Sequence, residues 1–189
     1  MLFLELDQLL FENIYQAIPH NLFFDWFFLF FSWLAYPKII WIPLVIGFLI
    51  FIRQHKGWIM FEAVIAMGVG VIANEYILKS IFARIRPFEF YESIQTIDTT
   101  ANGFSFPSSH ALVVFSFITV VILSTKSKKI HAALIVFALL VSVSRIYLGV
   151  HFPADIIAGA IFGILLGFLA SKFLPKFYKR VFHKRLKVK

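Results

Sequence analysis

Six apolar stretches, most of them long enough to cross a lipid bilayer, constrain this chain more than any other feature. Short polar or basic segments separate them, and 60% of the 189 residues are hydrophobic. A soluble domain of this size does not tolerate so apolar a composition. We therefore expect an all-α, polytopic membrane protein with six transmembrane helices in one bundle, forming a single membrane-embedded domain over residues 1–189. The expected spans are residues 21–36, 39–52, 58–78, 108–124, 130–143 and 153–173.

The first twenty residues have a different pattern from the spans. Leu2, Leu6, Leu9 and Leu10 share one face of a helix, and the acidic and amide side chains lie elsewhere. This pattern predicts an amphipathic helix over residues 1–20 that lies in the membrane interface. A signal peptide is not expected, because no basic segment and no small-residue cleavage site accompany the apolar stretch.

Lys and Arg are unevenly distributed among the segments that join the spans. With both termini inside, only five of the 18 lie on the outer side, and the other thirteen lie on the cytoplasmic side. This positive-inside pattern predicts cytoplasmic termini, with residues 174–189 as a basic cytoplasmic tail. The net charge of +8 is then a topology signal, and nucleic-acid binding is not expected. The five outer cations are Lys38, Lys79, Arg84, Arg86 and Arg145.

Three polar clusters lie on the predicted outer side, and the first is KSIFARIRP. Lys79 and Arg86 are seven residues apart, which predicts two cations on one helical face before Pro87 stops the helix. Two such cations would suit an anionic phosphate group. The alternative is that both side chains snorkel to the membrane interface.

The second cluster is FPSSHA, at the expected start of the fourth span. Ser108 or Ser109 can cap this helix, and its first backbone N–H groups and positive dipole end would then be available to an anion beside His110. In most proteins such a segment is an ordinary helix cap.

The third cluster, SRIYLGVHFPAD, sets Arg145, His151 and Asp155 within twelve residues, with Gly149 for a turn and Pro153 to open a helix. Because His151 and Asp155 are four residues apart, a helix from Pro153 would place the carboxylate against the imidazole and orient it as a base or nucleophile. The alternative is a polar loop beside the membrane.

Together, the three segments resemble the signature of the type 2 phosphatidic acid phosphatase family, membrane lipid phosphatases related in fold to vanadium-dependent haloperoxidases. The matching motifs are K-x6-R-P at 79–87, P-S-G-H at 107–110 and S-R-x5-H-x3-D at 144–155. The chain departs from the family in the second motif, where Ser109 stands in place of the usual Gly. The resemblance implies a metal-independent enzyme that hydrolyses a phosphate monoester or pyrophosphate on a lipid head group.

The resemblance also implies roles for individual residues. His151 would attack phosphorus and form a phosphohistidine, with Asp155 holding its other ring nitrogen, and His110 would protonate the leaving oxygen and then activate water. No metal ion or cofactor is expected. The phosphate oxygens would be bound by Lys79, Arg86, Arg145, Ser108 and the backbone around Ser109.

Residues outside the motifs carry weaker predictions. A salt bridge or solvated loop is expected for Arg84 and Glu89 rather than contact with substrate, and Asn74 and Glu75 are expected to brace Lys79. The partners implied are the bilayer and a lipid substrate, with undecaprenyl pyrophosphate, phosphatidylglycerophosphate, lipid A 1-phosphate and phosphatidic acid as candidates. The expected location is a bacterial cytoplasmic (inner) membrane, with the active site facing outward and the oligomeric state left open.

Two other functions remain as alternatives. A haloperoxidase would use the same pocket to hold vanadate, although such relatives are large and soluble. A lipid carrier or transporter would place polar groups near the middle of the bilayer and show internal repeats, whereas the middle of each expected span is apolar.

Overall fold

The structure is a computed structural model that describes residues 2–36 and 57–186. These residues are all-helical, as predicted, and contain no strand. In chain order the helices are α1 (Leu2–Ala17), α2 (Leu22–Leu34), α4 (Gly57–Ala73), η1 (Asn74–Leu78, a π-helical turn), α5 (Lys79–Phe82), α6 (Pro87–Phe90), α7 (Ser109–Ser124), α8 (Lys128–Tyr147) and α9 (Pro153–Leu186).

Three helical segments in the described part of the chain are long and apolar enough to cross a membrane. They are Ile59–Phe90, Lys128–Tyr147 and Pro153–Pro175. The helices α2 and α7 coincide with two further expected spans, but they are shorter. The expected span at 39–52 lies outside the described residues. The apolar helical character is thus confirmed, while the number of six spans stays a prediction.

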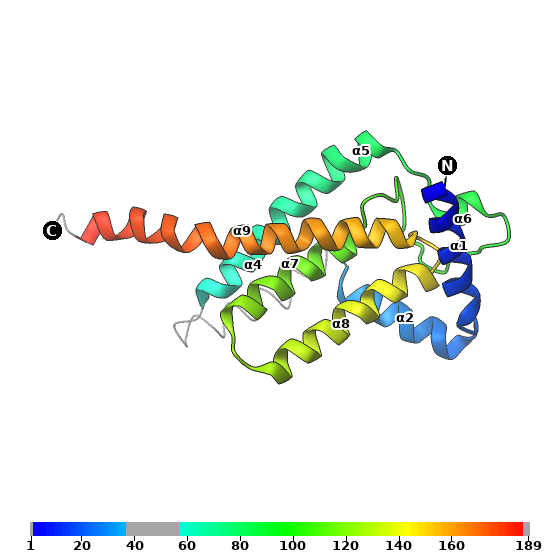
Figure 1. Cartoon of the computed structure of the whole chain (residues 1–189), viewed down its shortest axis with the longest axis horizontal. Coiled ribbons are helices and arrows are strands. Elements are labelled where there is room, and N and C mark those ends of the chain that lie inside the picture. Colours follow the sequence, from blue (N-terminus) through cyan, green and yellow to red (C-terminus); the bar gives the residue numbers. More distant parts are fainter. Residues whose placement is uncertain (1, 37–56, 187–189) are drawn as a thin grey trace.

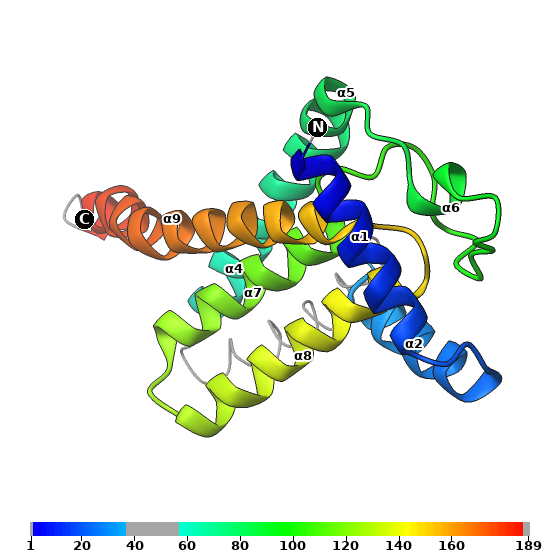
Figure 2. The same ribbon diagram turned by 45° about the vertical axis from the view of Figure 1, so that its right-hand side comes forward.

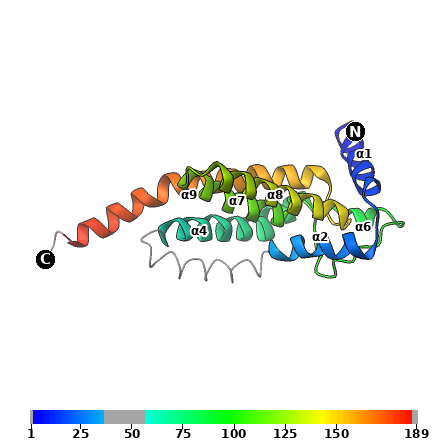
Figure 3. The ribbon, with the colours of Figure 1, turned by 90° about the horizontal axis from the view of Figure 1, so that it is seen from below.

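The central element of the bundle is α7, which packs against α4, α8 and α9. Figure 1 shows the long helices running along the molecule, with α1 and α6 at one end and the C-terminus at the other. Seen from below in Figure 3, the C-terminal part of α9 continues past the ends of its neighbours. Four helix termini meet at the end of the bundle near α1: the end of α5, the start of α7, the end of α8 and the start of α9.

A stripe of glycines sets the distance between α7 and α9. Gly159, Gly163 and Gly167 follow one another at intervals of four along α9, and a Cβ atom on the first two would lie 2.4 Å from the carbonyl oxygens of Ser108 and Leu112. At Gly167 the corresponding distance to the Ser116 oxygen is 2.7 Å. Only glycine allows so close an approach of two helix backbones. The stripe thereby fixes the N-terminus of α7 against the first turns of α9.

The amphipathic helix α1 lies across the end of the bundle (Figure 2). Its four predicted apolar residues, Leu2, Leu6, Leu9 and Leu10, are exposed, as expected of a face that contacts lipid. The opposite face is buried and contains Phe11 and an acidic residue, Asp7, which is only 4% exposed. The amphipathic helix is confirmed, and its place in the membrane interface remains a prediction.

The prediction that Lys79 and Arg86 share one helical face is wrong. The helix ends at Phe82, Ala83 adopts a left-handed conformation with a φ of 44°, and Arg86 is extended. Pro87 does not stop a helix but begins α6, where its missing N–H costs no hydrogen bond. Leaving the helix early lets Arg84 and Arg86 reach buried partners far along the chain. These tertiary contacts outweigh the further turn of helix that would have reached Arg86.

Candidate active site

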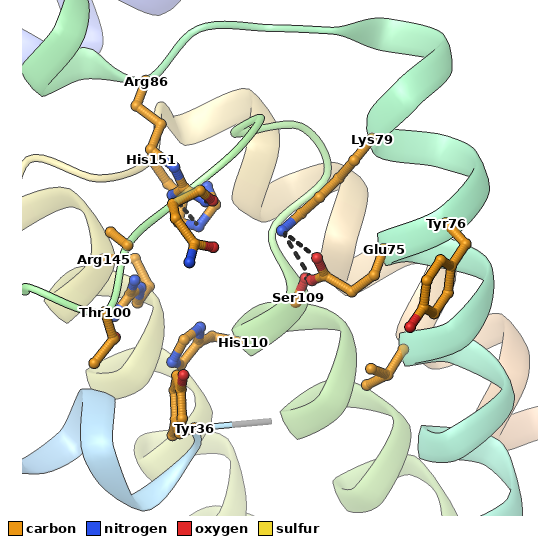
Figure 4. Close-up of a pocket in the computed structure, with 13 residues that line it drawn as sticks. Tyr36, Glu75, Tyr76, Lys79, Arg86, Thr100, Ser109, His110, Arg145 and His151 are labelled. Carbon is orange, nitrogen blue, oxygen red and sulfur yellow. Dashed lines mark hydrogen bonds and ion pairs between the residues drawn. The ribbon is translucent and has the colours of Figure 1, made fainter. Parts of the chain in front are cut away.

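A cavity of about 420 Å³ opens where the ends of α5, α7 and α8 meet the loop before α9. Six of the eight predicted site residues line it, drawn from all three sequence clusters: Lys79, Arg86, Ser109, His110, Arg145 and His151. Figure 4 shows them around a common space, with His110 facing the cavity beside Tyr36 and with Lys79 next to Glu75. The remaining lining residues are Tyr36, Val71, Glu75, Tyr76, Thr100, Ala101 and Asn102.

Main-chain hydrogen bonds hold the three clusters together. The Ser108 N–H donates to the Asp155 carbonyl at 3.0 Å, which joins the second cluster to the third. The N–H of Phe88, the residue directly after the first cluster, donates to the Gly149 carbonyl at 3.0 Å and so ties that segment to the third cluster. Gly149 has a φ of 69°, in the left-handed region that glycine adopts without strain, and this turn directs His151 toward the cavity.

His151 lies between a carboxylate and a guanidinium. Its Nδ1 is 3.4 Å from Asp155 Oδ2, and its Nε2 is 3.4 Å from Arg86 Nη1. Since a carboxylate only accepts and a guanidinium only donates, these neighbours favour the tautomer with the proton on Nδ1. The lone pair of Nε2 then faces Arg86 Nη1.

The imidazole of His151 is also held in its neutral form. Burial lowers the pKa of His151 well below its usual 6.5, and the positive charges of Arg86, Arg145 and Lys79 lower it further. A neutral imidazole is the form that can act as a nucleophile or base. The group therefore keeps its reactive form well into the acidic range.

Asp155 lies behind His151 and does not line the cavity. It is in the first turn of α9, which begins at Pro153 as predicted. Its carboxylate accepts hydrogen bonds from the Phe152 N–H at 2.9 Å and from Arg84 Nη1 at 2.7 Å. With two firm partners besides His151, this fully buried side chain has a fixed orientation. Arg84 forms a salt bridge, as predicted, rather than lining the cavity.

His110 is the second imidazole of the cavity and lies in the first turn of α7. Its Nε2 is buried and has no hydrogen-bond partner among the described residues. Buried polar atoms are nearly always satisfied, so an unpartnered nitrogen lining a cavity indicates that a ligand or solvent group completes it. The Tyr36 ring lies beside the imidazole, with 5.8 Å between the ring centroids.

Each of the three cations of the cavity is anchored by other groups of the protein. Lys79 Nζ lies 2.8 Å and 3.0 Å from the two oxygens of Glu75, which braces it as predicted. Arg145 donates to Ser32 and, at 2.8 Å, to Asp98. Arg86 donates to the carbonyls of Asn102, Gly103, Phe104 and Val150 at 2.8 to 3.2 Å. The cations are thus positioned in advance of any ligand.

Asp98, the partner of Arg145, lies outside the three sequence clusters. Burial by itself raises the pKa of Asp98, but Arg145 and the hydrogen bonds from Thr100 outweigh it and hold the pKa below its usual range. Asp98 therefore stays ionised and balances the charge of Arg145. The only signal in the sequence was an acidic residue in the loop between α6 and α7, and the fold brings it to Arg145.

The two serines of the second cluster have different surroundings. Ser108 caps α7 by accepting from the Ala111 N–H, and it lies outside the cavity lining. The Ser109 hydroxyl lines the cavity but is already engaged, since it accepts from Asn74 Nδ2 at 2.7 Å and donates to Glu75 at 2.5 Å. The prediction that Asn74 braces Lys79 is therefore wrong, because Asn74 donates a hydrogen bond to Ser109 instead.

Comparison with known proteins places the cavity in context. The family model described as the PAP2 superfamily matches residues 58–179, which include all the predicted site residues. An undecaprenyl-diphosphatase of Sulfolobus acidocaldarius is 37% identical over 131 residues, covering 69% of this chain and 62% of that protein, less than two thirds of its length. The crystal structure of Aquifex aeolicus LpxE superposes with a TM-score of 0.73 at 31% identity, covering 89% of this chain and 96% of that one. A phosphatidylglycerolphosphate phosphatase of Bacillus subtilis gives a TM-score of 0.72 at 25% identity, with 89% and 86% covered.

Proposed function

Because this chain belongs to the PAP2 superfamily, we propose that it is a membrane lipid phosphatase that cleaves a phosphate monoester or pyrophosphate from a lipid head group. The observation that carries the proposal is the convergence of two histidines and three anchored cations on one cavity at the end of an apolar helix bundle. Relatives named for an undecaprenyl diphosphate and for a phosphatidylglycerolphosphate support the lipid class.

The proposed reaction begins with attack of His151 Nε2 on phosphorus. The bond from phosphorus to the leaving oxygen breaks, His110 gives that oxygen a proton, and a phosphohistidine remains. Water then attacks the phosphohistidine, His110 takes a proton from the water, and inorganic phosphate leaves with His151 restored. Asp155 accepts from Nδ1 throughout and stabilises the positive imidazole of the intermediate.

Charge stabilisation is the role proposed for the three cations. Phosphoryl transfer needs mainly alignment and neutralisation of the equatorial oxygens, and fixed charges supply both without reorganisation. Lys79, Arg86 and Arg145 line the cavity for this purpose, together with the free N–H groups at the start of α7.

We expect the purified protein to release phosphate from at least one of the four candidate lipids: undecaprenyl diphosphate, phosphatidylglycerophosphate, lipid A 1-phosphate and phosphatidic acid. Activity should survive excess EDTA, because the cavity cations neutralise the phosphate. Vanadate should inhibit as a trigonal mimic of the transition state. Phosphate release across the panel, with EDTA alone and with EDTA plus Mg²⁺, measures this. Loss of activity on chelation that Mg²⁺ restores would contradict the proposed mechanism.

The cavity is proposed to face outward from a bacterial cytoplasmic membrane, with both termini inside, on the basis of the charge distribution. Because the chain contains no cysteine, single cysteines can be introduced without a background. Thr99 is exposed in the loop before α7, and Lys128 is exposed at the start of α8. We expect an impermeant thiol reagent to label Thr99→Cys but not Lys128→Cys in intact spheroplasts. The opposite labelling would invert the proposed topology.

A further inference from the structure

Arg84 lies between two carboxylates, one beside the cavity and one on the amphipathic helix. Its Nη1 donates to Asp155 Oδ1 at 2.7 Å, and its Nη2 donates to Asp7 Oδ2 at 2.6 Å. The guanidinium also lies over the ring of Phe152, 4.0 Å from its centroid. The other oxygen of Asp7 accepts from the Ala154 N–H at 2.8 Å, within the first turn of α9. Asp7 is therefore bound both to Arg84 and to the turn that carries Asp155.

The charges of this cluster do not cancel. Two buried carboxylates share one guanidinium, so the unit of Asp7, Arg84 and Asp155 carries one excess negative charge. Buried carboxylates are costly unless they are paired, which explains why Arg84 contacts both. Because Asp7 occupies one arm of Arg84, Asp155 is not fully neutralised and presents negative charge to Nδ1 of His151.

We propose that Asp7 is a positioning residue for the His151–Asp155 pair and acts through Arg84. The inference rests on the proposed role of His151 as nucleophile. Attack on phosphorus converts the imidazole to a cation, and negative charge at Nδ1 stabilises that cation. Asp7 acts on the pair by sharing Arg84, and its hydrogen bond from the Ala154 N–H holds its carboxylate in place. The helix α1 then supports the His151–Asp155 pair, in addition to its expected contact with the membrane surface.

Asp7→Asn tests this directly, because it removes the charge and preserves the shape. We expect kcat to fall about ten- to a hundredfold, because Asp155 then presents less negative charge to the imidazole that becomes a cation. KM should change by less than about twofold, since Asp7 does not line the cavity that binds the phosphate. Glu5→Gln is the matched control, because it makes the same charge change at an exposed position of the same helix and should leave kcat unchanged.

The acid limb of kcat/KM separates an electrostatic role from a packing defect. The charged and titratable groups facing the His151 ring are Asp155 at Nδ1, Arg86 at Nε2, and Lys79, Arg145 and His110 around the cavity. Asp7 and Arg84 lie on the far side of Asp155 from the His151 ring. The negative charge of Asp7 favours protonation of His151, and the positive charge of Arg84 disfavours it. Asp7→Asn should therefore move the acid limb to lower pH, and Arg84→Gln should move it to higher pH. A packing defect does not shift the limb in opposite directions.

A double-mutant cycle tests whether Asp7 acts through Arg84. In the Arg84→Gln background, Asp7→Asn should lower kcat by no more than about twofold further. A full additional loss, or wild-type kcat and pH profile in Asp7→Asn, would overturn the inference.

If Asp7→Asn does not fold in detergent, Asp7→Glu is the second variant. It keeps the charge but displaces the carboxylate, so it should lower kcat and leave the acid limb of the pH profile unchanged. His151→Ala separates the two levels: if it is active, the proposed role of His151 as nucleophile fails, whereas if it is inactive and Asp7→Asn is normal, only this inference fails.

Discussion

His151→Ala is expected to reduce phosphate release to the uncatalysed background while the protein remains folded. The substitution deletes the atom that is proposed to attack phosphorus, and no neighbouring group of the cavity can replace it in that geometry. The side chain is not a packing element of the apolar core, so the bundle should persist. Phosphate release by the purified variant, together with its unfolding temperature in detergent, measures both parts of the expectation.

Two further variants serve as comparisons for His151→Ala. Asp155→Asn should retain residual activity, because a group that orients the nucleophile is less essential than the nucleophile itself. His131→Ala removes an imidazole from α8 that bonds Thr125 and lies outside the cavity, so its activity should be normal. Near-normal phosphate release by His151→Ala would end the phosphohistidine mechanism.

Ser109→Pro is expected to lower the rate about a hundred- to a thousandfold, the usual cost of losing one donor aimed at developing negative charge. Ser109 is the first helical residue of α7, where proline fits the backbone but removes the N–H. That N–H is among the groups at a helix start that have no partner within the helix. The expected loss is therefore of a phosphate donor and not of the helix, which unfolding measurements can verify.

The contrast with Ser109→Ala and Ser109→Gly isolates the backbone contribution. Both variants lose the hydroxyl that joins Asn74 to Glu75, but Asn74 still donates to the Pro107 carbonyl and Glu75 still pairs with Lys79. We therefore expect both to stay within about tenfold of the parent, roughly 1.4 kcal/mol in the barrier. If Ser109→Ala proves as damaging as Ser109→Pro in a folded protein, the hydroxyl and its network are essential and the backbone explanation is wrong.

The local predictions that depended on short-range chemistry agree with the structure. Pro153 opens α9, Gly149 makes the turn before His151, and Ser108 caps α7. Each outcome follows from a property of one residue type: the fixed φ of proline, the left-handed conformations open to glycine, and the hydroxyl of serine. The prediction that Lys79 and Arg86 share a helical face is wrong, because helical periodicity holds only as far as the helix, and tertiary contacts of Arg84 and Arg86 end it at Phe82.

The sequence by itself determined the apolar helical character of this chain, its amphipathic N-terminal helix and six of the side chains that line the cavity. Those conclusions depend on composition, spacing and motif, which are properties of neighbouring residues. Only the tertiary structure decided the partners of the charged groups: Asp98 for Arg145, and Asp7 for Arg84. These pairs are 47 and 77 residues apart. No local pattern relates residues so far apart in the sequence. Their pairing depends on the packing of α9 against α7 and of α1 across the end of the bundle, because this packing buries the opposite charges next to each other.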